Sequence, residues 1–113
     1  MDKILNYIKE AFAYIKNFVV RIINGCINFV RNVIGWFKSL PIKQGRDVPF
    51  IANANKQEFK ALLKKAPTKD VGIFQGVYNE VSDEITYNEY LDADAVDQQT
   101  KNVLGNEELV VLG

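Results

Sequence analysis

The chain has 113 residues, of which 48% are hydrophobic and 25% are charged, and its 14 Lys/Arg balance its 14 Asp/Glu. This length and composition suit one small folded domain, or a domain of about 65 residues with an appendage. The sequence contains no histidine and one cysteine, Cys26. These counts exclude His-based acid–base catalysis, metal sites built from His or several Cys, and an intramolecular disulfide.

The charges are distributed unevenly along the chain. Residues 1–47 carry eight Lys/Arg against three Asp/Glu, whereas residues 48–113 carry six against eleven. A basic half joined to an acidic half predicts two differently specialised segments and favours head-to-tail association between copies.

Residues 3–40 show the hydrophobic period of an amphipathic helix. Eleven apolar positions from Ile4 to Leu40 recur with a mean spacing of 3.6 residues, which is the helical period. The Asn24-Gly25 pair favours a β-hairpin instead, but residues 18–23 would place apolar side chains on both faces of a strand, which argues against alternating strands. We therefore predict a long N-terminal helix and leave open a bend or break at Gly25.

Such a helix would be too long for its own domain to cover. Residues 3–40 would extend about 57 Å at 1.5 Å per residue, whereas a 65-residue domain is only about 28 Å across. Three covers remain open: a break at Asn24-Gly25 that lets two helices bury each other, a protein assembly, or a membrane interface.

The apolar side of this helix is the predicted interaction face for a protein partner or a homo-oligomer through residues 4–40. Its residues are Ile4, Ile8, Ile15, Phe18, Ile22, Phe29, Val33 and Trp36. In the membrane alternative, Lys9, Lys16 and Lys38 would flank the apolar side at the headgroups of an anionic membrane surface. No window of about 18 uncharged residues spans a bilayer, and the N-terminus does not match a signal peptide.

The remaining chain predicts an α+β module. Residues 41–54 contain Pro41, Gly45 and Pro49 and predict an extended linker. Within a small acidic module at 55–113 we expect a helix at 55–66, a hairpin of strands 71–78 and 84–91, a helix at 92–104 capped by Asp92 or Asp94, and a strand at 109–112 beside the hairpin. The predicted fold class is thus α+β, with domains 1–40, 41–54 and 55–113.

Sequence motifs indicate no catalytic, cofactor or metal site. The run from Asp92 to Asp97 lacks the glycine turn and distal glutamate of a calcium loop, and there is no glycine-rich phosphate loop. The cations form no contiguous basic patch, which argues against nucleic acid. An enzyme would have to work with carboxylates, Tyr or Lys alone, and we expect no small-molecule substrate.

The segments "GIFQGVYNEVSDEI" and "DADAVDQQTKNVLGNEELVVL" resemble small uncharacterised proteins of bacteriophages that infect gut Bacteroidetes. The resemblance covers about half of the chain and implies a virion or host-takeover component, in the virion or the cytoplasm. The sequence therefore predicts a non-enzymatic structural or interaction protein, with a peripheral membrane protein as the alternative.

Overall fold

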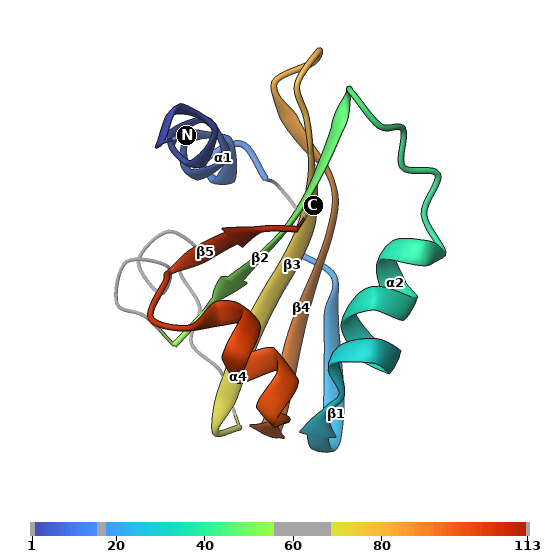
Figure 1. The fold of residues 1–113 in the computed structure, drawn as a ribbon, viewed down its shortest axis with the longest axis vertical. Helices are drawn as coiled ribbons and strands as arrows, with labels where there is room; N and C mark the ends of the chain where they lie inside the picture. The colour runs from blue at the N-terminus through green and yellow to red at the C-terminus, as the bar shows by residue number, and fades with distance from the viewer. Residues whose placement is uncertain (1, 16–17, 56–68, 113) are drawn as a thin grey trace.

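Five strands form one mixed sheet in the computed structural model, which describes residues 2–15, 18–55 and 69–112 (Figure 1). The strand order is β1-β4-β3-β2-β5. Strand β1 runs parallel to β4, and every other neighbouring pair is antiparallel. The strands are β1 (Val20–Ile27), β2 (Asp47–Asn53), β3 (Val71–Asn79), β4 (Glu84–Val96) and β5 (Leu109–Val111).

The predicted long N-terminal helix is wrong. Helix α1 covers only Asp2–Phe12, and the chain then enters the edge strand β1. A short π-helix, η1 (Phe29–Ile34), follows and continues into α2 (Gly35–Lys38). The helical spacing thus runs through four elements: α1 buries its apolar side chains in one core, whereas β1, η1 and α2 bury theirs in another.

The Asn24-Gly25 pair is neither the middle of a helix nor a hairpin turn. Gly25 has φ of 133°, which no helical residue adopts. The pairing of β1 with β4 shifts register between Ile23 and Cys26, so the pair forms an irregularity inside the strand. β-Branched residues such as Val20, Ile22 and Ile23 favour the extended backbone around it.

Two segments outside the hairpin extend the sheet on the β3 side. Residues 47–53, expected in the linker, form β2, which pairs with β3 on one side and with β5 on the other. The expected strand at 109–112 forms as β5, but it pairs with β2 and not with a strand of the hairpin. The helix expected at 55–66 lies almost entirely outside the described residues.

The predicted hairpin is confirmed, with β3 and β4 paired antiparallel around residues 80–83. Strand β4 continues to Val96, so the helix expected from residue 92 begins later, as α4 (Gln98–Leu104). Its N-cap is Asp97, not Asp92 or Asp94, and Gly105 follows its end as expected. The stretch 92–96 is a strand because β1 pairs with it over Tyr90–Val96, and such tertiary pairing overrides local helix signals.

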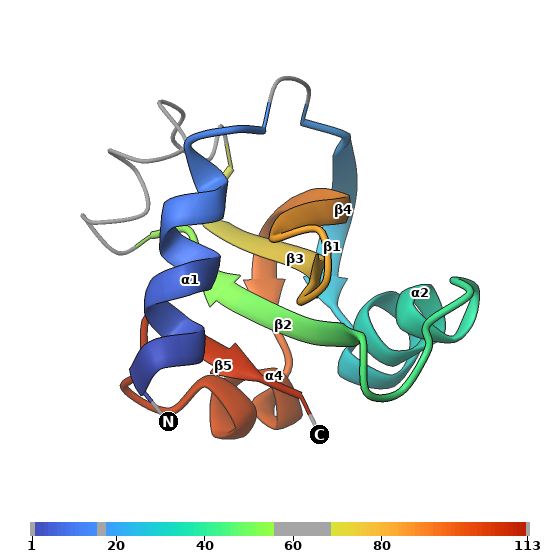
Figure 2. The same cartoon turned by 90° about the horizontal axis from the view of Figure 1, so that it is seen from above.

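The sheet has one hydrophobic core on each face. Figure 2 shows α1 on one side of the sheet and α2 on the other. The α1 side contains a core in which Ile8, Phe12 and Phe74 are buried. The other side contains Phe29, Val33 and Leu104 from η1 and α4, packed on Ile51 and Leu91 of the sheet.

Candidate functional site

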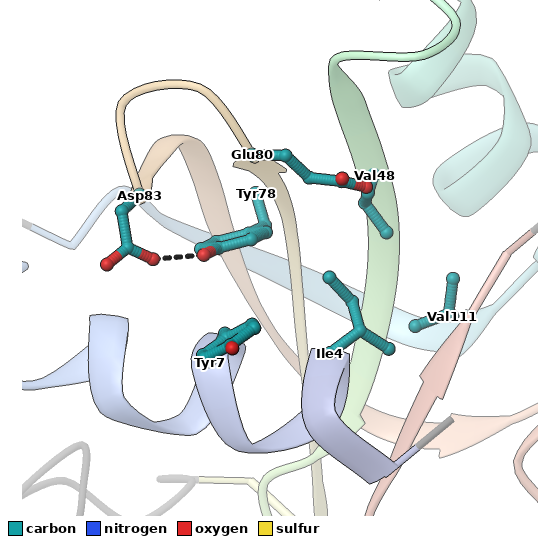
Figure 3. Close-up of a pocket in the computed structure, with 7 residues that line it drawn as sticks. All are labelled: Ile4, Tyr7, Val48, Tyr78, Glu80, Asp83 and Val111. Carbon is teal, nitrogen blue, oxygen red and sulfur yellow. Dashed lines mark hydrogen bonds between the residues drawn. The ribbon is translucent and has the colours of Figure 1, made fainter.

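A groove with a volume of about 810 Å³ lies between α1 and the β3–β4 hairpin (Figure 3). This volume lies in the range of known ligand pockets, about 300–1,000 Å³. A smaller hollow of about 350 Å³ continues it along α1 and shares Tyr7 and Asp83 with it. We call the two together the α1 groove. Its larger part is lined by Ile4, Tyr7, Val48, Tyr78, Glu80, Asp83 and Val111.

The floor of the groove is apolar because three elements meet there. Ile4 comes from α1, Val48 from β2 and Val111 from β5. Figure 3 shows Ile4 and Tyr7 on the side of α1 that faces Tyr78 and Val48. Tyr7 is 49% exposed and Val111 is 37% exposed, so an incoming group could bury apolar surface on both of them.

Tyr78 anchors one wall of the groove through its hydroxyl. The ring is buried, and the hydroxyl donates a hydrogen bond to the Asp83 carboxylate. Burial first, and then this bond and the charges of Asp83 and Glu80, raise the pKa of the Tyr78 phenol well above its ordinary value of 10.0. The phenol therefore stays protonated at neutral pH and holds the Asp83 side chain in place.

Local hydrogen bonds fix the hairpin loop that carries the acidic residues. The side-chain oxygen of Asn79 accepts from the backbone N–H groups of Val81 and Ser82, at 2.8 and 3.0 Å. The N–H of Glu80 donates to the Arg46 carbonyl at 2.9 Å, which ties the loop to the start of β2. Two carboxylates are thus presented by a loop whose backbone is bonded on both sides.

The charge of the groove is one-sided. Glu80 and Asp83 line its larger part, and Glu10 of α1 lines the smaller one. Among the described residues lining either part there is no Lys or Arg. Arg46 lies nearby in the chain, but its guanidinium is bonded to Asp47 at 2.7 and 3.0 Å. The groove therefore combines an apolar floor with three carboxylates at its rim and no Lys or Arg among the lining residues that the structure describes.

The polar groups of the groove are carboxylates and a protonated phenol. A protonated Tyr78 is a poor base at neutral pH, and the chain has no histidine to activate a nucleophile. No group of three potential metal ligands occurs among the described residues. What the arrangement can do is bind, through apolar contact and attraction of positive charge.

The structure separates the eight residues of the predicted interaction face. Ile8 is fully buried beneath α1, where Ile15 and Phe18 pack against the same core, and Ile4 lies in the groove. The other face of the sheet receives Phe29, Val33 and Trp36. Only Ile22 remains largely exposed, on β1. A single continuous apolar face does not exist, because the residues belong to four elements on two sides of a sheet.

The three predicted membrane-edge cations are also separated. Lys9 bonds the Glu108 carboxylate at 3.3 Å, and Lys38 is exposed on α2 on the other side of the sheet. Lys16 lies outside the described residues.

Sequence reasoning missed Tyr78, Glu80 and Asp83 as site residues. The polar loop at 79–83 was recognised, but nothing local indicated that α1 would lie against it.

Comparisons with protein-family models, curated proteins and solved structures give no match. None of the described helices is both long enough and apolar enough to cross a bilayer.

Proposed function

We propose that this chain is a non-enzymatic interaction protein that binds a basic, partly apolar segment of a protein partner in the α1 groove. The observation that carries the proposal is the one-sided charge of the groove: Glu10, Glu80 and Asp83 surround its apolar floor without a described Lys or Arg among the lining residues. Lysine and arginine side chains match such a groove, since their alkyl stems cover apolar surface while their charged ends reach the carboxylates.

The tyrosines support the same class of partner. Tyr7 and Tyr14 are 49% and 80% exposed, and both line the groove. A cation placed over an exposed tyrosine ring gains about 0.5–1 kcal/mol. An acidic segment would instead meet three carboxylates with like charge.

A protein partner is favoured over a membrane surface by the burial of α1. The membrane alternative needed the apolar side of the N-terminal helix to face lipid. Ile8, Ala11 and Phe12 on that side are buried against the sheet, so their apolar surface is already removed from water.

The proposal is tested with a fluorescein-labelled peptide of alternating Lys and Leu, titrated with the protein and followed by anisotropy. Removing two groove charges through Glu80→Gln with Asp83→Asn should weaken binding about fivefold, at about 0.5 kcal/mol for each exposed ion pair. Binding should also weaken as NaCl is raised from 50 to 300 mM.

The matched control removes two exposed charges elsewhere, by Asp70→Asn with Glu107→Gln. This variant should bind like the original chain. Equal losses in both variants, or equal binding of an alternating Glu and Leu peptide, would show that the groove does not recognise the basic segment.

A further inference from the structure

Strand β1 is an open edge of the sheet with exposed apolar side chains. It pairs only with β4, so its outer side has no neighbour among the described strands. Val20 and Ile22 are 37% and 54% exposed, whereas Ile23 and Ile27, on the opposite side of the strand, pack into the core. An edge of this kind is a template for pairing with another strand.

The usual protections of an edge strand are missing from the first half of β1. Residues 20–24 contain no Pro, Lys, Asp or Glu, the residues that commonly block edge pairing. The one charge, on Arg21, is on a half-exposed side chain whose Nε lies 3.4 Å from the buried Glu89 carboxylate of its own sheet. The outward side chains Val20, Ile22 and Asn24 are neutral, so two copies would not repel each other there.

The backbone directions define how two copies could pair. The carbonyl of Val19 accepts from the N–H of Tyr90, and its own N–H donates to the Asn88 side chain. Peptide groups alternate along a strand, so Arg21 and Ile23 also face β4. Val20 and Ile22 therefore direct their N–H and C=O groups away from the sheet, where they can pair with a second strand.

Among the registers centred on Val20, Arg21 and Ile22, the one centred on Ile22 best satisfies charge and geometry together. In an antiparallel pair, two residues that lie opposite each other have their side chains on the same face of the sheet. A two-fold axis that relates two copies of β1 must therefore pass through a residue position, so that this residue lies opposite itself in the second copy. An axis at Arg21 would set two guanidinium groups opposite each other, and an axis at Val20 would extend pairing to Phe18, whose ring packs on Phe74. An axis at Ile22 keeps positions 20–24 within β1 and opposes Arg21 to Ile23.

We propose that β1 pairs antiparallel with β1 of a second copy of this chain, with Ile22 opposite Ile22, to give a continuous ten-stranded sheet. The Ile22 pair exchanges both backbone hydrogen bonds, and Val20 lies opposite Asn24 on each side of it. The contact is isologous, as a two-fold dimer requires. It leaves the α1 groove of each copy open, because that groove is formed by α1, β2, β5 and the hairpin loop.

Sedimentation velocity over a concentration series tests the dimer. The mass should approach twice the 12.8 kDa of one chain as concentration rises. Ile22→Lys places two like charges opposite each other and should raise the dimer dissociation constant at least tenfold. Val30→Lys, at a position 60% exposed on η1, is the control and should leave the dissociation constant unchanged.

A cysteine scan in a Cys26→Ser background tests the register and does not depend on the charge variant. Hydrogen-bonded antiparallel positions have Cα atoms about 5.5 Å apart, which is within disulfide range. Ile22→Cys should therefore form an inter-chain disulfide under mild oxidation, whereas Val20→Cys should not. A chain that stays monomeric at all concentrations, or that crosslinks equally through both positions, would overturn the proposal.

Discussion

At the scale of single residues, Tyr78 shows how the groove depends on burial and charge together. The phenol is buried, and the Asp83 carboxylate accepts its hydrogen bond. Because its pKa is raised in the folded state, the folded chain holds this proton more tightly than the unfolded chain. This proton stabilises the folded chain fully at pH values below 10.0, the ordinary pKa of the phenol, and the stabilisation is lost as pH rises above that value.

We predict that the free energy of unfolding falls as pH rises from 10 to 11, measured by urea denaturation. Tyr78→Phe should lower that free energy by about 1 kcal/mol at pH 7, the usual contribution of one hydrogen bond, and should flatten the fall above pH 10. Part of the fall should remain, since burial also raises the pKa of Tyr90, to about 12. The control Tyr14→Phe, at a side chain 80% exposed, should change neither quantity. An unaltered pH profile in Tyr78→Phe would contradict the assignment.

At the scale of elements, Asp97 joins two helices that are far apart in the sequence. One carboxylate oxygen accepts from the Thr100 N–H at 2.9 Å and caps α4, while the other accepts from the Phe29 N–H at 3.0 Å, where η1 begins. Burial by itself would raise the pKa of Asp97, but the hydrogen bonds from Thr100 and Phe29 outweigh burial and lower that pKa below 3.8. The side chain therefore stabilises both helix starts in its charged form.

Asp97→Ala should lower the free energy of unfolding by about 2 kcal/mol at pH 7, since it removes a helix cap and a second backbone acceptor. Asp97→Asn should lose less at pH 7. It should also be less sensitive to acid, because the charged Asp97 stabilises the fold above pH 3.8 and this stabilisation is lost as pH falls through its lower folded pKa. Chemical denaturation between pH 2 and 7 measures both effects.

Some acid sensitivity should remain in Asp97→Asn, because the hydrogen bond from Arg46 also lowers the pKa of Asp47. Asp94→Ala is the surface control. Its carboxylate is half exposed and pairs with Lys69 at 3.2 Å, so its loss should cost about 0.5 kcal/mol or less. A loss in Asp94→Ala as large as that in Asp97→Ala would argue against a special role for the cap.

The elements that could be predicted from the sequence are those defined by local contacts. The β3–β4 hairpin could be predicted because two β-rich runs flank a polar loop, and the end of α4 could be predicted because glycine commonly follows a helix. In the structure Gly105 has φ of 55°. The start of α4 was missed because residues 92–96 are held extended by pairing with β1, about 70 residues earlier, and residues 92–93 also by pairing with β3. The spacing of residues in the sequence does not predict that β1 pairs with β4.

The N-terminal error has a different cause. Apolar residues on both faces of 18–23 argued against a strand, since a half-buried strand should alternate. In the structure Ile23 faces the core, and Val20 and Ile22 are exposed on an edge strand. The apolar residues of α1, β1 and η1 follow a spacing of 3.6 residues by chance. The candidate groove could not be predicted either, because α1 meets the hairpin loop only in the folded sheet.

At the scale of the whole molecule, the N-terminal third covers both faces of the sheet. Helix α1 contributes Ile8, Ala11 and Phe12 to one core, and η1 with α2 contributes Phe29, Val33 and Phe37 to the other. The described strands of the C-terminal part therefore depend on residues 1–40 for their cover. This dependence bears directly on the division at residue 40 that the sequence suggested.

We predict that a chain of residues 41–113 does not fold alone. Removing residues 1–40 deletes β1 and exposes apolar surface on both faces, and each large buried side chain contributes about 1.5–3 kcal/mol. Their sum is about as large as the net stability of about 5–15 kcal/mol that a small domain has. The fragment should show narrowly dispersed amide proton shifts by NMR and no cooperative thermal transition. The full chain should unfold in one transition, and Phe12→Ala should lower its stability by about 3–5 kcal/mol. Cooperative unfolding of 41–113, or of 55–113, would instead establish an independent C-terminal domain, with residues 1–40 as an appendage to it.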